Sequence, residues 1–171
     1  MMTFMSVSGQ PPTEAGYLTF IRTIMAIPVE ALPDDSPAIH CSFCSALTLA
    51  NCAMLVVGNA CPDQPSYHAW AVYNLGGDIL VNYAPDNDDA TPPVEPPNDH
   101  YFTILRTKLG LNSFVPGIIQ SSSDNGTSVS YMTPGWMEQM TLANLQQLKT
   151  PWGRQYLMLA QAYGPTIWGL S

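Results

Sequence analysis

The sequence is poor in positive charge. Its 171 residues contain five lysines and arginines against 13 aspartates and glutamates, a formal net charge of -8 at pH 7. A surface of this kind repels the phosphates of nucleic acids and anionic lipid headgroups. The few bases are scattered along the whole chain, so they form no basic patch that could grip DNA or RNA. DNA could pass close to such a protein, but we expect no specific binding.

Formal charge is missing altogether between Asp35 and Asp63. This run is long enough to be considered as a membrane span. It contains His40 and several hydroxyl residues, and no lysine or arginine flanks it, so a buried helix is the better interpretation. No base precedes Arg22, and we therefore expect neither a secretory signal nor a transit peptide. In such a chain the four cysteines indicate reduced thiols and a cytosolic origin.

Motifs for phosphate and calcium binding are also missing. Gly76-Gly77 lacks the flanking residues of a phosphate-binding loop. Asp86, Asp88 and Asp89 lack the glycine and the distal glutamate of a calcium-binding loop. We interpret the acidic group as part of a solvated segment, and we predict no cofactor.

The cysteines raise the question of a metal site. Cys41 and Cys44 have a ligand-like spacing, and His40, Cys52 and Cys61 lie nearby in the sequence. A zinc site built from them would require tight loops, whereas the sequence predicts a long apolar helix. We therefore predict no metal.

Helical periodicity dominates the first half of the chain. Thr13 is a favourable cap for a helix from Glu14 to about Ala26. Ser36-Pro37 is a strong start for a second helix, which we expect to end at Gly58-Asn59. The second helix carries an apolar stripe at helical spacing, made of Ile39, Phe43, Leu47, Ala50, Met54 and Val57.

The segment Tyr67–Ala84 has two interpretations. By propensity, AWAVYN and DILVNY flank a glycine pair and look like a β-hairpin. By period, the same residues form a helical stripe, although two adjacent glycines cost a helix roughly 2 kcal/mol relative to alanines. Local evidence alone slightly favours the hairpin.

The middle of the chain is less regular. Pro85 to Pro97 is rich in proline and acid and predicts an extended linker. A short helix should follow from about Asp99 to Leu109, with Gly110 ending it. Residues 117–132 then predict a β-hairpin with its turn at Asp124-Asn125-Gly126. A lone hairpin is marginal in water, so we expect it to contact something else.

The C-terminal part predicts two more helices and an apolar end. Thr141 opens a helix through Leu148, and Thr150-Pro151 repeats the start seen at Ser36-Pro37. The last helix presents Trp152, Tyr156, Leu159 or Ala160 and Tyr163 on one face. The final six residues, TIWGLS, are half large and apolar. We expect such a segment to become ordered only when it packs against a partner or against the body of the protein.

One functional hypothesis is a thiol enzyme. Cys44, or Cys41, would be the nucleophile, His68 the base, and Asn82 or Asp86 the group that orients it. His-Ala-Trp followed by an acid loosely resembles transglutaminase-like and papain-fold sequences. That resemblance implies a small cysteine hydrolase or amidase. Buried, inert thiols explain the same residues without catalysis.

A second resemblance covers most of the chain. It is carried by SSSDNGTSVS, by KTPWGRQYL and the terminal tryptophan, and in the first half by an IP…LP connection, an alanine-rich helix and AVYNLGGDILV. The sequence resembles the head-to-tail connector (adaptor) proteins of tailed bacteriophages. These motifs are soft, none is catalytic, and the cysteine-rich second helix is not explained by them. The resemblance shifts the interpretation of Tyr67–Ala84 toward a helix, with Gly76-Gly77 marking close helix packing.

The resemblance implies a structural role without catalysis. Copies would form a ring, typically dodecameric, beneath the portal protein and prolong the DNA channel toward the stopper or tail-completion protein. The subunit would be made in the host cytoplasm and reside in the neck of the virion, with no membrane partner. DNA would pass through the acidic lumen without specific binding.

We therefore expect a mainly α single domain over residues 1–171, a small helical bundle with a β-hairpin excursion and an extended C-terminal arm. Its parts are a helical body (13–110), a hairpin arm (117–132), and C-terminal helices with a docking tail (141–171). The residues expected to dock on the portal are Trp152, Arg154, Tyr156, Ile167, Trp168 and Leu170. The hairpin near Asp124 and Tyr131 is expected to contact an adjacent subunit or the next ring.

Overall fold

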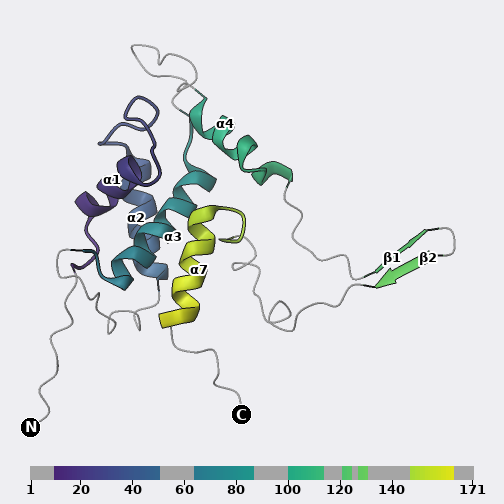
Figure 1. Ribbon diagram of the computed structural model, residues 1–171. Coiled ribbons are helices and arrows are strands. Elements are labelled where there is room, and N and C mark those ends of the chain that lie inside the picture. Colours follow the sequence, from purple (N-terminus) through teal and green to yellow (C-terminus); the bar gives the residue numbers. More distant parts are fainter. Residues whose placement is uncertain are drawn as a thin grey trace, which may run out of the picture.

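The computed structural model describes residues 10–50, 64–86, 100–113, 121–124, 127–130 and 147–163. The protein is mainly α-helical and forms a small helical bundle, as predicted (Figure 1). Its helices are α1 (Glu14–Thr23), α2 (Pro37–Leu49), α3 (Tyr67–Tyr83), α4 (Tyr101–Lys108) and α7 (Pro151–Tyr163), with a short 3-10 helix at Leu111–Ser113. Figure 1 shows α1, α2, α3 and α7 side by side and α4 at one end.

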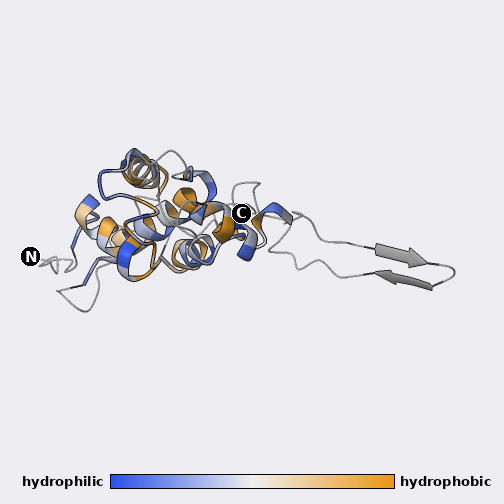
Figure 2. Ribbon diagram, turned by 90° about the horizontal axis from the view of Figure 1, so that it is seen from above, coloured by the Kyte–Doolittle hydropathy of each residue, from blue (hydrophilic) through white to orange (hydrophobic). Residues whose placement is uncertain are grey.

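The central element is α3, which contacts α1, α2, α4 and α7. Of its 17 residues 12 are buried. Figure 2 shows hydrophobic segments gathered where the helices meet. The helical interpretation of Tyr67–Ala84 is therefore correct, and the local preference for a hairpin was wrong. A helix buried on nearly all sides carries apolar residues on every face, which is why its sequence has strand-like apolar runs.

The glycine pair in α3 lies where α1 packs most closely. A Cβ on Gly76 would lie 2.9 Å from Cζ of Tyr17, and a Cβ on Gly77 would lie 3.0 Å from Sδ of Met25. These positions confirm that Gly76-Gly77 marks close helix packing. The loss of helix propensity at two glycines is offset by the approach of an aromatic ring to the α3 backbone.

Tyr17 organises the packing of α1 against its neighbours. The residue is fully buried, and its ring stacks on Phe43 and Tyr73 at centroid distances of 5.7 and 6.0 Å. Its hydroxyl shares a hydrogen bond of 3.0 Å with Oγ of Ser42. Burial raises the pKa of Tyr17 well above its ordinary value, while the hydrogen bond to Ser42 acts in the opposite direction. The start of α1 is capped as predicted, because Thr13 Oγ1 accepts from the backbone N–H of Gly16.

The second helix is shorter than predicted. It starts at Pro37 but ends at Leu49, where Ala50 adopts an extended backbone with φ -66° and ψ 138°. Leu47, expected in the apolar stripe, is 42% exposed. The stripe residues Met54 and Val57 lie outside the described residues. Within the described part of the chain, no helix has both the length and the apolar character needed to cross a bilayer.

The ends of α3 and α4 cap each other. Arg106 of α4 donates to the carbonyls of Val81, at 2.8 Å, and Ala84 at the end of α3. In return, Asp86 accepts from the backbone N–H of Phe102 at 2.6 Å, in the first turn of α4. Gly110 has φ 67° just beyond α4, which agrees with the predicted helix end.

A two-stranded antiparallel pair lies within the predicted hairpin. β1 (Ser121–Asp124) pairs with β2 (Thr127–Ser130), with Ser121 opposite Ser130 and Asp124 opposite Thr127. Residues 125 and 126 of the predicted turn lie outside the described residues. So do most of the predicted linker after Pro85, most of the predicted helix after Thr141, and the final segment TIWGLS.

Candidate functional site

An open apolar groove of about 460 Å³ lies among the described helices. It lies between the end of α1 and the first turns of α3 and α7. Its floor and rim are mostly aromatic or aliphatic: Phe20, Ile24, Tyr67, Trp70, Asn74, Pro151, Trp152, Gln155 and Leu159. Ile24 is 56% exposed and so contributes apolar surface to the groove that solvent can reach. The groove offers shape and apolar surface, with few polar groups.

Helix α7 forms one wall of this groove, and a buried polar junction with α3 holds it there. Thr150, just before α7, accepts from the backbone N–H of Gly153 at 2.9 Å and donates to Oδ1 of Asp78 at 2.5 Å. Asn82 donates to the same carboxylate oxygen at 3.3 Å. A Cβ on Gly153 would overlap the carbonyl of Gln147, so a glycine is required at this approach. The hydroxyl therefore caps α7 and ties it to α3.

Asp78 is the acidic centre of that junction. Only 5% of the residue is exposed, and burial raises the pKa of its carboxyl to about 6. The hydrogen bonds from Thr150 and Asn82 and the charge of Lys149 act in the opposite direction. The carboxylate has its hydrogen-bond partners and does not face the groove lining, so its role is to hold α7 in place.

The predicted contact residues of α7 separate into two groups. Trp152 lines the groove, and Arg154 is exposed and donates to the carbonyl of Leu148 at 3.0 Å. Tyr156 is 8% exposed and belongs to the hydrophobic core. This placement makes it a bundle residue in the described structure, and the contact role predicted for it stays a prediction. The helical period put Tyr156 on one face with Trp152, and the structure shows that this face packs against α3.

The other predicted contact residues give little further information. Asp124 is the last residue of β1, where its backbone pairs with Thr127. Tyr131, Ile167, Trp168 and Leu170 lie outside the described residues. Their contact roles stay predictions.

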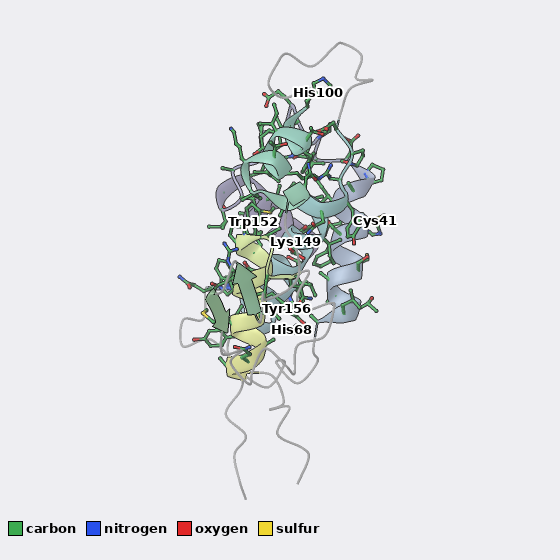
Figure 3. All side chains as sticks on the ribbon, turned by 90° about the vertical axis from the view of Figure 1, so that its right-hand side faces the viewer. Cys41, His68, His100, Lys149, Trp152 and Tyr156 are labelled. Atoms are coloured by element: carbon green, nitrogen blue, oxygen red, sulfur yellow. The ribbon has the colours of Figure 1, made fainter. Side chains whose placement is uncertain are left out.

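The thiol-enzyme arrangement is not assembled. Cys44 is exposed on α2, whereas His68 is buried in the first turn of α3 with 5% exposure. Burial lowers the pKa of His68, and its Nδ1 has no hydrogen-bond partner among the described residues. Figure 3 shows His68 near one end of the body, at the level of Tyr156 on α7. Among the described residues no hydrogen bond joins Cys44 to His68, so the structure does not bring them together as a nucleophile and its base.

The groups proposed to orient His68 have other partners. Asn82 binds the carbonyl of Asp78, and Asp86 caps α4. His68 is in the first turn of α3, and Asp86 follows its last turn, so most of a helix about 26 Å long separates them. The sequence order Cys-His-Asn-Asp suggested a triad, but α3 holds its members apart.

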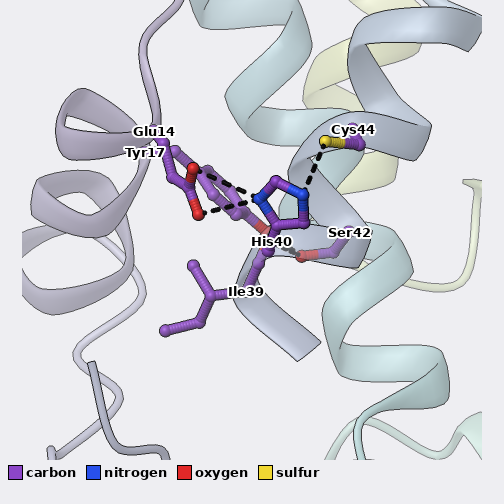
Figure 4. Close-up of polar contacts among 6 residues, drawn as sticks. All are labelled: Glu14, Tyr17, Ile39, His40, Ser42 and Cys44. Carbon is purple, nitrogen blue, oxygen red and sulfur yellow. Dashed lines mark hydrogen bonds and ion pairs between the residues drawn. The ribbon is translucent and has the colours of Figure 1, made fainter. Parts of the chain in front are cut away.

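The structure brings Cys44 to a different histidine. Its Sγ lies 3.5 Å from Nε2 of His40, one turn earlier on α2. Nδ1 of His40 lies 3.2 and 3.3 Å from the two carboxylate oxygens of Glu14, the first residue of α1 (Figure 4). The four-residue spacing of His40 and Cys44 could have predicted their contact. Glu14 comes from another helix, and no local pattern predicts its approach.

The only site role that the sequence suggested for His40 was that of a metal ligand. In the described part of the chain, no three His, Cys, Asp or Glu side chains are grouped so that they could hold a metal ion. Cys52 and Cys61 lie outside that part. The two described cysteines, Cys41 and Cys44, are free and exposed.

Comparison with known proteins found no matching family model, no similar curated protein and no similar solved structure.

Proposed function

We propose that this protein is a structural subunit of a bacteriophage neck, a head-to-tail connector that assembles as a homo-oligomeric ring beneath the portal. The proposal rests on the resemblance of the sequence to that family, and the observation that supports it most directly is the open aromatic groove beside α7. A mainly α body is consistent with the family, and a net charge of -8 suits a channel wall along which DNA slides.

In this proposal the groove receives an apolar segment of the portal protein. Trp152, Trp70 and Ile24 provide the buried centre of the contact, and the exposed Arg154 contributes at its rim. Aromatic residues in a concave apolar surface are typical anchors of protein interfaces. The C-terminal residues Ile167, Trp168 and Leu170 dock on the same partner, and the β1–β2 hairpin contacts an adjacent subunit or the next ring. The hairpin thereby finds the support that two isolated strands lack.

The test is assembly with the portal of the phage that encodes the chain, followed by electron microscopy and mass photometry. We expect a ring of copies on one face of the portal. Ile24→Lys places a charge in the groove without removing a buried side chain, and it should abolish the ring. Leu49→Lys is the matched control, because Leu49 is 66% exposed and does not line the groove. It should assemble like the wild type.

Deletion of Thr166–Ser171 should likewise leave a folded protein that no longer joins portals. Normal assembly of this truncated chain would exclude the tail as a docking element. If Ile24→Lys and Leu49→Lys assembled equally well, the groove would not be the contact surface. If no ring formed with the wild-type chain, the connector function itself would be wrong.

A further inference from the structure

We propose that Cys44 is a thiol-modification site that exchanges with low-molecular-weight disulfides, with His40 as the base for the thiol proton and Glu14 as the residue that positions His40. The inference does not rest on the proposed connector function. Figure 3 shows Cys41, on the same helix as Cys44, on a different side of the body from Trp152, so the cysteine-bearing face is separate from the groove.

The contacts of His40 determine which nitrogen carries its proton. Both Glu14 oxygens lie near Nδ1, and a carboxylate can only accept hydrogen bonds. Nδ1 must therefore be the donor, which leaves Nε2 of the neutral ring as an acceptor. That nitrogen is the one 3.5 Å from Sγ of Cys44. The order carboxylate, imidazole, thiol is the arrangement that activates a cysteine nucleophile.

The cluster is supported by the packing beneath it. Tyr17 lies one turn after Glu14 on α1, and Ser42 lies between His40 and Cys44 on α2. Their buried hydrogen bond of 3.0 Å joins the two helices directly below the cluster (Figure 4). The backbones that carry the three groups are therefore fixed relative to one another, although the groups themselves are at the surface.

The exposure of the cluster determines what kind of reagent it can meet. The side chains of His40 and Glu14 are 64% and 50% exposed, and Cys44 is also exposed. Cys44 does not line the groove near α7, so that groove cannot hold a substrate against the thiol. An open thiol of this kind suits exchange with a small soluble disulfide better than hydrolysis of a bound substrate, which needs a site that stabilises an oxyanion.

The exchange is balanced in atoms and electrons. Nε2 of His40 accepts the proton of the Cys44 thiol, and the resulting thiolate attacks one sulfur of the disulfide. One S–S bond forms between Cys44 and that sulfur while the original S–S bond breaks. The leaving thiolate takes the proton back from His40. Cys44 is oxidised to a mixed disulfide, and the leaving half of the reagent is reduced to a thiol.

Cys41 provides an internal reference. It is exposed on the same helix, three residues before Cys44, and among the described residues it has no hydrogen-bond partner. Exposure alone therefore predicts similar rates of disulfide exchange at Cys41 and Cys44. Base assistance by His40 predicts a faster rate at Cys44 only, by about tenfold or more.

The experiment uses the reduced full-length protein with cystamine at neutral pH, quenched with acid at timed intervals. Chymotrypsin cleaves after Phe43 and so separates Cys41 from Cys44 for quantification of each mixed disulfide by mass spectrometry. We expect Cys44 to be modified first. Cys41→Ser should leave the Cys44 rate unchanged, which excludes transfer through the neighbouring thiol.

The decisive variants are His40→Ala and Glu14→Gln. His40→Ala should lower the Cys44 rate to that of Cys41, although removal of the ring improves access and would by itself raise the rate. Glu14→Gln should give an intermediate rate. Circular dichroism should show unchanged helicity in both, because both side chains are at the surface. Equal rates at the two cysteines of the wild type, or a Cys44 rate that His40→Ala leaves unchanged or raises, would overturn the proposal.

Discussion

At the scale of single residues, Asp78 is the side chain whose chemistry most depends on the fold. Its carboxyl is buried between α3 and α7, and burial raises its pKa from 3.8 to about 6. The folded state therefore binds the Asp78 proton more tightly than the unfolded state does. Protonation of Asp78 therefore adds to the free energy of unfolding; this contribution is fully present below about pH 4 and is lost as the pH rises through about 6.

Asp78→Asn should remove this pH dependence. The amide oxygen can still accept the hydrogen bond from Thr150, but the group no longer ionises. Relative to the variant, the wild type should gain roughly 1 to 3 kcal/mol of unfolding free energy between pH 7 and pH 4. Urea unfolding at both pH values measures the difference. The prediction fails if the wild type and the variant change in parallel, because Asp78 would then ionise equally easily in both states.

At the scale of elements, the packing of α1 on α3 depends on two adjacent glycines with different neighbours. A Cβ on Gly76 meets the ring of Tyr17, which is fixed by stacking and by its hydrogen bond to Ser42. A Cβ on Gly77 meets the end of Met25, a flexible side chain that can move aside. The two positions are equivalent in helix propensity and differ in what the added methyl group displaces.

Gly76→Ala should therefore destabilise the protein by about 1 to 3 kcal/mol, because overpacking outweighs the gain in helix propensity. Gly77→Ala is the matched control and should be neutral or stabilising by up to about 1 kcal/mol. The midpoints of urea unfolding of the two variants compare the effects directly. Equal destabilisation by both would mean that Met25 is held as firmly as Tyr17.

The elements that the sequence predicted are those defined by local residues. The cap at Thr13, the start of α2 at Pro37, the start of α7 after Thr150, and the end of α4 at Gly110 all depend on neighbours within a few residues. Burial on nearly all sides obscured α3, because a helix with apolar residues on every face shows no distinct helical or strand-like pattern. The early end of α2 at Leu49 has no local breaker, so an uninterrupted apolar stripe predicted a longer helix.

The candidate sites were less predictable because their residues meet across elements. The period of α7 placed Trp152 and Tyr156 on one face, but a period does not tell which part of that face is covered by the bundle, where Tyr156 lies. Glu14 reaches His40 across 26 residues, and Thr150 reaches Asp78 across 72. Pairs at such separations are brought together by tertiary packing, and no characteristic spacing in the sequence predicts them.

At the scale of the whole molecule, charge sets the conditions under which copies can associate. Each copy carries a net charge of -8, so neighbouring copies in the proposed ring would repel one another. The contact proposed for the groove is apolar and gains nothing from electrostatic attraction. Salt should therefore act mainly on the repulsion, whose range falls from about 30 Å at 0.01 M to about 8 Å at 0.15 M ionic strength.

Assembly of the ring on the portal should consequently increase as sodium chloride is raised from about 0.01 to about 0.15 M, the range in which screening lengths become shorter than a subunit. Mass photometry at fixed protein and portal concentrations measures the fraction assembled. Sucrose at matched osmolality is the control for water activity and should have a smaller effect. Ile24→Lys and Leu49→Lys lower the net negative charge equally, so only loss of the groove contact should make them differ. A ring that leaves the portal on addition of salt would show that opposite charges hold the assembly together, and the apolar contact in the groove could not be the main source of its stability.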